Sequence, residues 1–197
     1  MRLVEADGSP AAAPPVTYLL IDGENLDSTL GVSVLGHRPS PEERPRWERV
    51  IQFAAESWGP PVKTLFFLNA SSGSLPMPFV QALLAIGARP IGLSGPSTVK
   101  VVDVAIQRTL SAIAGRHGNV MLGSHDGDFY PQIAALLDGR RNVAILAFRE
   151  YMNHRYVDLV KGGLRIFDLE YDAMCFNQML PRVRIIDITA FDPEPFL

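Results

Sequence analysis

Aspartates in two short segments are the side chains of this sequence best suited to chemistry. Asp22 and Asn25 lie in the segment IDGEN, directly after an apolar run, and Asp126 and Asp128 flank a glycine in the segment GSHDGDF. Carboxylate and amide oxygens are preferred ligands of hard divalent cations. Aspartate is also common in turns and at helix N-caps, and Asp128 stands where an N-cap is expected. These segments alone therefore leave both a metal site and ordinary turns open.

Apolar runs and helical patterns alternate along the chain and must position these side chains. Strands are expected at residues 16–21, 62–68, 90–93, 120–122, 143–148 and 164–167, and the first of them has the continuous apolar pattern of a strand buried on both faces. Helices are expected at residues 47–55, 79–86, 99–114, 129–137 and 156–160, and a long polar loop at residues 31–45. The alternation predicts an α/β fold, in which an open parallel sheet carries helices on both faces in a Rossmann-like three-layer arrangement.

Such a sheet would bring the candidate residues to one edge. Each helix begins at the carboxyl end of the strand before it, so Lys100 and Asp103 in the first turn of the long helix join the two aspartate segments there. If the second and third strands lie on one side of the first strand, and the fourth and fifth on the other, the first and fourth become neighbours. The switch point then falls between Asp22 and Asp126, where open sheets of this type bind ligands.

Carboxylates held at one crevice raise each other's pKa, and a divalent cation relieves their repulsion. The candidate ligands offer oxygen only: Asp22, Asp103, Asp126, Asp128 and the amide of Asn25. Because no cysteine or histidine pair stands at ligand spacing, Mg²⁺ or Mn²⁺ is favoured over zinc.

Composition indicates one globular domain. The chain has 197 residues, of which 47% are hydrophobic and 20% charged. We expect a disordered lead-in at residues 1–15, the domain at residues 16–169, and a C-terminal extension at residues 170–197 with a helix and a strand-like run at residues 182–191. The single cysteine, Cys175, excludes an internal disulfide framework. With no signal-peptide pattern and no apolar run of membrane-spanning length, we expect a cytoplasmic protein with no membrane partner.

Three segments also resemble a known family, the NYN domain in the LabA-like branch of the PIN-like nuclease superfamily, over about residues 16–169. They are IDGEN at residues 21–25, KVVDVA at residues 100–105 and GSHDGDF at residues 123–129. The resemblance implies a metal-dependent ribonuclease of PIN-like fold. It places these residues at the metal: Asp22, Asn25, Asp103, Asp126 and Asp128. It places Lys100 near the scissile phosphate, whereas His125 and Val101 depart from residues that the family usually has.

The leading hypothesis is hydrolysis of single-stranded RNA by metal-activated water, with Mg²⁺ or Mn²⁺ as the cofactor. Asp22, Asp126 and Asp128 are expected to be the main ligands. Asp103 would complete the site, and Asn25 would orient a ligand or the phosphate. The net charge of −3 gives no global attraction to RNA, so a local set of side chains must hold it. The expected substrate-binding residues are Lys100, Ser124, Arg149 and Arg155.

Two other functions compete with this hypothesis. A phosphatase of the haloacid dehalogenase type also begins with an aspartate after its first strand, but it requires a second aspartate where this chain has Glu24. A catalytically weak or inactive NYN module could act in RNA binding or assembly, because a fold does not establish an activity. We further hypothesise a homodimer through residues 182–191 and leave open a regulatory protein partner.

Overall fold

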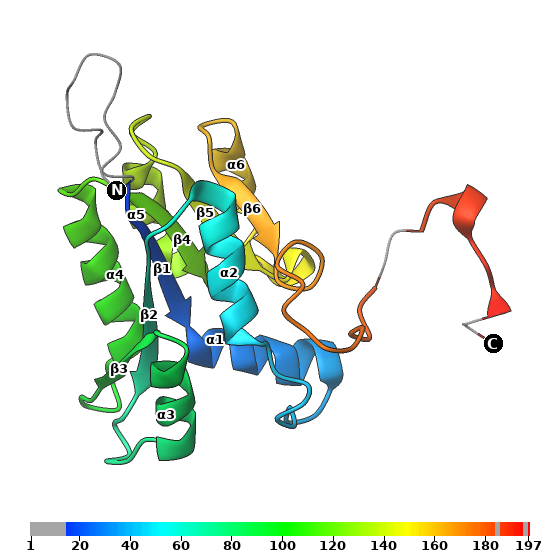
Figure 1. Cartoon of the computed structure of the whole chain (residues 1–197), viewed down its shortest axis with the longest axis horizontal. Helices are drawn as coiled ribbons and strands as arrows, with labels where there is room; N and C mark the ends of the chain where they lie inside the picture. Colours follow the sequence, from blue (N-terminus) through cyan, green and yellow to red (C-terminus); the bar gives the residue numbers. More distant parts are fainter. Residues whose placement is uncertain (1–14, 184–185, 195–196) are drawn as a thin grey trace, which may run out of the picture.

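Six of the apolar runs form one parallel sheet in the computed structural model, which describes residues 15–183, 186–194 and 197 (Figure 1). The strands are β1 (Thr17–Asp22), β2 (Val62–Asn69), β3 (Arg89–Leu93), β4 (Asn119–Gly123), β5 (Val143–Ala147) and β6 (Arg165–Asp168). Their order across the sheet is β3-β2-β1-β4-β5-β6. The predicted α/β class and the predicted neighbours of the first strand are therefore confirmed.

Helices cover both faces of the sheet (Figure 1). One face carries α1 (Gly23–Ser28), the π-helix η1 (Thr29–Leu35), α2 (Trp47–Trp58) and α3 (Met77–Ala85); the other carries α4 (Val101–Ala114), α5 (Tyr130–Leu136) and α6 (Tyr156–Val160). Alternation along β1 feeds both cores, because Leu19 and Ile21 pack under α1 to α3 while Leu20 packs under α4 to α6. No helix among the described residues combines the length and the apolar character needed to cross a membrane.

The crossover through α4 creates the switch point. The chain leaves β3 at one edge of the sheet and passes in α4 along the face opposite to α2 and α3. It returns as β4 beside β1, where Ile21 is in register with Gly123. The carboxyl ends of β1 and β4 therefore lie next to each other, and α4 begins near them. This arrangement brings three distant stretches of the sequence to one place.

The prediction of a loop at residues 31–45 is wrong for residues 31–35. Helical structure continues directly from α1 into η1, and Leu30 and Val34 are buried under the sheet. Burial of these apolar side chains outweighs the low helix propensity of Gly31. Gly36, with a φ of 74°, ends this helical stretch in the left-handed conformation that glycine adopts easily.

The C-terminal prediction is also wrong where the structure describes the chain. Residues 170–183 and 186–194 form turns and the short 3₁₀ helix η4 (Ile188–Ala190), with neither the expected α-helix nor a strand. In Figure 1 the end of the chain leads away from the sheet, so the alternating pattern has no strand beside it to pair with. Val183 and Ile188 are consequently exposed. The homodimer stays a prediction, and the lead-in at residues 1–14 lies outside the described residues.

Candidate functional site

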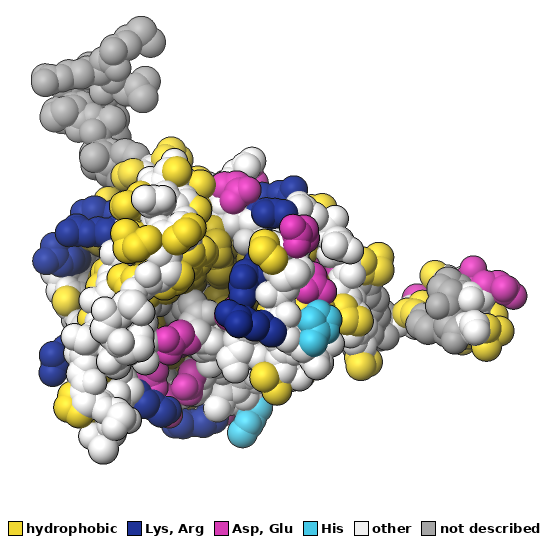
Figure 2. All heavy atoms as spheres, turned by 90° about the horizontal axis from the view of Figure 1, so that it is seen from below, with side chains coloured by type: hydrophobic (Ala, Val, Ile, Leu, Met, Phe, Trp, Pro, Cys, Tyr) yellow, Lys and Arg dark blue, Asp and Glu magenta, His cyan; other side chains and the backbone are white. Residues whose placement is uncertain are grey.

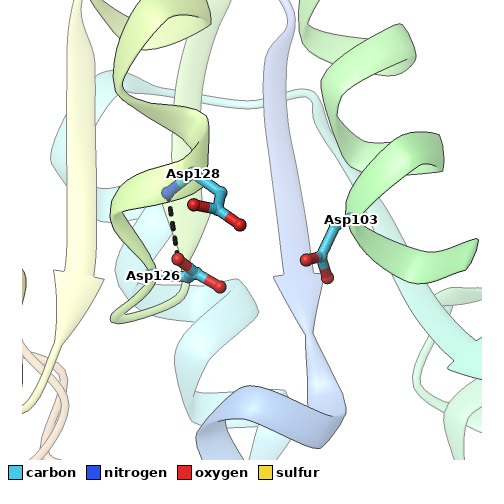
Figure 3. A group of neighbouring side chains, drawn as sticks. All are labelled: Asp103, Asp126 and Asp128. Atoms are coloured by element: carbon cyan, nitrogen blue, oxygen red, sulfur yellow. Dashed lines mark hydrogen bonds between the residues drawn. The ribbon is translucent and has the colours of Figure 1, made fainter. Parts of the chain in front are cut away.

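Three carboxylates converge at the switch point. Asp126 and Asp128 follow β4, on the loop and on the 3₁₀ helix η2 (Gly127–Phe129), and Asp103 lies in the first turn of α4. One carboxylate oxygen of each residue lies within 4.8 Å of those of the other two. Figure 3 shows Asp103 pointing from α4 across the end of β1 toward the loop that carries the other two aspartates. Asp103, Asp126 and Asp128, which come from two separate stretches of the sequence, thus form one acidic cluster, which we call the acidic triad.

The loop after β4 has a defined shape that presents two of these side chains. The Oδ1 atom of Asp126 accepts a hydrogen bond of 2.9 Å from the backbone N–H of Asp128, so Asp126 is the N-cap of η2. The Tyr156 hydroxyl donates a 2.6 Å hydrogen bond to the Asp126 carbonyl and ties the loop to α6. The sequence had suggested Asp128 as the N-cap, but the residue that caps η2 is Asp126. Asp128 is exposed, and its carboxylate lies close to those of Asp103 and Asp126.

Lys100 partly compensates the charge of the acidic triad. Its Nζ atom lies 3.1 Å from Oδ2 of Asp128 and 3.2 Å from Oδ2 of Asp103. The hydrogen bond to Asp128, followed by that to Asp103, raises the pKa of Lys100 above its ordinary value. The Lys100 side chain is 70% exposed, so these ion pairs contribute little to folding stability.

Asp22 supports the site from the buried end of β1. The Ser124 hydroxyl donates a 3.0 Å hydrogen bond to its Oδ2 atom, and the Asn25 backbone N–H donates one of 3.3 Å to Oδ1. Burial, with smaller contributions from the charges of Asp103 and Asp126, raises the pKa of Asp22 to about 6, although the two hydrogen bonds lower it. Asp22 is thus an electrostatic neighbour of the acidic triad without belonging to it. Ser124 is buried and contacts Asp22, so the structure does not bear out its expected contact with a substrate.

Replacing Asp22 by asparagine is expected to flatten the pH dependence of stability in metal-free buffer. The pKa of this carboxyl rises from 3.8 in the unfolded chain to about 6 in the fold, so the folded protein binds the proton more tightly. The free energy of unfolding of the wild-type protein therefore falls as pH rises from about 4 to 6, by at most about 3 kcal/mol. Chemical denaturation in EDTA from pH 4 to 7 measures this loss. Parallel wild-type and variant curves would contradict it.

His125 and Asn25 form a second contact, which is partly buried, between the ends of β4 and β1. The backbone N–H of Phe148 donates a 2.9 Å hydrogen bond to Nε2 of His125, which must therefore carry no proton. The proton stays on Nδ1, which lies 2.9 Å from Oδ1 of Asn25, and the His125 backbone N–H donates to the same oxygen at 2.8 Å. Burial lowers the pKa of His125 to about 4, in agreement with a neutral ring.

This contact changes two interpretations made from the sequence. The Asn25 oxygen was expected among the metal ligands, but it already accepts two hydrogen bonds. His125, which departs from the residue usual in NYN domains, is buried and faces Asn25 and Phe148. That departure was the available signal in the sequence. Its partners could not be read from the sequence because they lie 100 and 23 positions away.

Basic side chains lie near the acidic triad. Figure 2 views the molecule from the side on which α1 lies in Figure 1, and it shows acidic side chains gathered with lysine and arginine side chains to either side. The Arg155 guanidinium lies 4.4 Å from the centre of the Tyr130 ring, and Tyr130 follows Asp128 by two residues. Arg149 is held instead by Asp172, at 2.6 Å. Lys100 and Arg155 are therefore the better placed of the predicted substrate-binding cations.

Comparisons with known proteins support the fold. No family model matches the sequence, and no curated protein matches it. A crystal structure of a protein of unknown function from Vibrio parahaemolyticus RIMD 2210633 is similar, with a TM-score of 0.62 and 17% sequence identity. The similarity covers 83% of this chain and 98% of that chain. At this identity, the likeness shows a shared fold alone.

Proposed function

We propose that this protein is a ribonuclease that depends on Mg²⁺ or Mn²⁺ and hydrolyses phosphodiester bonds of single-stranded RNA. The observation that carries the proposal is the convergence of Asp103, Asp126 and Asp128 at the switch point of the sheet. Neighbouring carboxylates repel each other, so a fold that assembles them favours a bound cation. The resemblance to NYN domains supports the same activity, because its three segments supply the acidic triad, Asp22 and Lys100.

The donor set fits a hard divalent cation. Each member of the acidic triad offers a carboxylate oxygen, and Asp22 adds negative charge behind them. We expect Asp103, Asp126 and Asp128 to hold the ion, and Ser124 and the Asn25 backbone to orient Asp22. When bound, Mg²⁺ or Mn²⁺ would lower the pKa of a coordinated water and neutralise charge on the phosphate.

The remaining residues have roles that follow from their chemistry. Lys100 has an exposed side chain that can turn from the carboxylates to a phosphate oxygen, and an ammonium group suits a single negative charge. Arg155 on the ring of Tyr130 offers a second cation beside a flat aromatic surface. Single-stranded nucleic acids are commonly bound by such pairs of charge and stacking surface. This combination supports RNA over a small phosphate ester as the substrate.

Replacing Lys100 by methionine is expected to tighten Mn²⁺ binding about tenfold, because removing one nearby positive charge stabilises the ion by roughly 1.4 kcal/mol. RNA binding should weaken in the same variant. Isothermal titration with MnCl₂ at low salt measures the first effect, and Lys63→Met removes the same charge from an exposed position of β2 as the control. Unchanged Mn²⁺ affinity in Lys100→Met would show that the ammonium group does not compete with the ion.

One observation favours the second candidate, a non-catalytic RNA-binding or assembly module. Lys100 bridges Asp103 and Asp128, so a side chain of the protein itself compensates part of the acidic triad. In that case the site would need no ion, and Mn²⁺ would bind weakly or not at all. Metal binding therefore separates the two candidates.

The test is a titration of the pure protein with MgCl₂ and MnCl₂. Calorimetry measures metal binding, and a labelled single-stranded RNA reports cleavage. The ribonuclease proposal expects saturable metal binding and cleavage that EDTA stops. Asp103→Asn should lose both, whereas Asp158→Asn, which removes an exposed carboxylate on α6, should lose neither. RNA binding without metal binding and without cleavage would favour the non-catalytic module.

A further inference from the structure

We infer that Asn25 donates its side-chain NH₂ group to a phosphate oxygen of the RNA, and that His125 is the positioning residue that keeps it in this orientation. The inference rests on the proposed function, because it concerns the substrate of that site. It assigns Asn25 to the phosphate and not to the metal. The orientations of Asn25 and His125 are fixed by hydrogen bonds whose direction the backbone sets.

The orientation of the Asn25 amide follows from its contact with the backbone of His125. A backbone N–H can only donate, and this one lies 2.8 Å from the nearest amide atom of Asn25. That atom must therefore be the oxygen, because an NH₂ group there would oppose two donors. The NH₂ group of Asn25 consequently occupies the other position.

The His125 ring adds a second constraint of the same kind. The Phe148 backbone N–H can only donate to Nε2, so Nδ1 carries the ring proton and donates to the Asn25 oxygen. Two donors then use both lone pairs of this oxygen. It has no capacity left to bind a metal ion.

The surroundings of His125 hold the ring in place. Its ring stacks on Phe148 with centroids 5.5 Å apart and an angle of 18° between the planes. Its carbonyl accepts a 3.1 Å hydrogen bond from the Asn153 backbone. Because His125 is buried and held on both sides, its contact with Asn25 is part of the rigid frame of the site.

The NH₂ group of Asn25 is suited to an anion. Asn25 is half-buried. It lies three residues after Asp22, where β1 ends, and beside the loop that carries Asp126. Within the described part of the chain, its NH₂ group makes no hydrogen bond. A donor attracts a phosphate oxygen and repels a cation. A phosphodiester held over the acidic triad is the ligand that this group fits.

Two variants of His125 separate its two contacts. Asparagine places its amide nitrogen near the position of Nδ1, so His125→Asn can still donate to Asn25. Glutamine places its terminal group near the position of Nε2, so His125→Gln keeps the contact with Phe148 and loses the one with Asn25. Circular dichroism and thermal melting establish that each variant is folded.

The measurements are Mn²⁺ affinity by calorimetry and the KM and kcat for a labelled single-stranded RNA. A hydrogen bond to a charged group is worth about 1.5–3 kcal/mol, so Asn25→Ala and His125→Gln should raise KM by roughly 10- to 100-fold. His125→Asn should remain near the wild-type KM. Mn²⁺ affinity should be unchanged in all three variants, because none of them removes a ligand of the ion.

Asn25→Asp provides a test that does not depend on His125. Aspartate keeps an oxygen for both donors but replaces the NH₂ group by a second oxygen, so RNA binding should be lost while Mn²⁺ binding is kept. Long-range ¹H–¹⁵N spectra should show the Nδ1–H tautomer of His125 in the wild-type protein. Weaker Mn²⁺ binding in Asn25→Ala, or equal KM values in His125→Gln and His125→Asn, would overturn the inference.

Failure of the inference is distinguishable from failure of the proposed function. A wild-type protein that binds no Mn²⁺ and cleaves no RNA would overturn both. A wild-type protein that cleaves RNA, with an Asn25→Ala variant of unchanged KM, would overturn the role of Asn25 and leave the ribonuclease proposal intact.

Discussion

Replacing Asp126 by asparagine is expected to reduce RNA cleavage by more than about 100-fold, since changes even to outer partners of metal ligands cost 10- to 100-fold. The substitution removes one charge of the acidic triad and weakens Mn²⁺ binding. The fold should be unaffected, because Oδ1 of asparagine can still accept the hydrogen bond from the Asp128 backbone that caps η2. Stability in EDTA should be equal or slightly higher, because repulsion with Asp103 and Asp128 falls.

The matched control for this variant is Asp187→Asn. Asp187 caps η4 through the same type of hydrogen bond, with Oδ1 2.8 Å from the Thr189 backbone nitrogen, but it lies outside the acidic triad. Cleavage rates from single-turnover assays and Mn²⁺ affinities from calorimetry compare the two variants. Full activity in Asp126→Asn, after exclusion of contaminating nuclease, would contradict the role of the acidic triad and favour the binding module.

Replacing Arg182 by methionine is expected to lower the free energy of unfolding by about 3–5 kcal/mol, the usual cost of removing one partner from a buried ion pair. The guanidinium is 2% exposed and binds the carboxylates of Glu150, Asp168 and Glu170. It also lies 4.9 Å from the centre of the Phe148 ring. Without this cation, the fully buried Asp168 loses its main compensating charge. Urea denaturation at pH 7 measures the effect.

The pH dependence provides a check on the cause. In the wild-type protein, hydrogen bonds from Arg182 hold the pKa of Glu150 and Asp168 below their ordinary values against the effect of burial. Carboxylates with a lowered pKa stabilise the fold above their unfolded pKa, and that stability is lost as pH falls through the folded pKa. The deficit of Arg182→Met should therefore be largest at neutral pH and shrink in acid.

The control for Arg182 is Arg49→Met. Arg49 also binds the C-terminal extension, but its acceptors are uncharged: the carbonyls of Met174 and Phe176 and the side chain of Asn177. Arg49 is exposed, so its loss should cost about 1 kcal/mol and show little pH dependence. Equal losses in the two variants would show that packing of the extension, and not the buried charge, accounts for the stability.

The architecture of this protein could be predicted from its sequence because the signals are local. Mainly apolar runs predicted all six strands, most clearly β4 and β5, since a strand covered on both faces must be apolar throughout. Alternation with helices then led to a parallel sheet, and a parallel sheet places every strand-to-helix junction at one edge. The location of Asp103, Asp126 and Asp128 at a common edge followed from that geometry.

Other features could not be predicted in this way, because their signals are weak or misleading. The segment from Thr29 to Leu35 is helical because Leu30 and Val34 are buried, although Gly31 and the prolines that follow the segment indicated a loop. The alternating pattern after Arg182 indicated a strand, but a strand requires a neighbour, and the described chain offers none there.

The sequence by itself determined which residue types reach the switch point: aspartates, an asparagine and a lysine near the ends of β1 and β4. The tertiary structure alone decided which atoms they use. Asn25 meets His125 across 100 positions, and Arg182 meets Glu150 across 32. Hydrogen bonds depend on distances of about 3 Å and on donor direction, which sequence spacing does not specify once the partners lie on different elements.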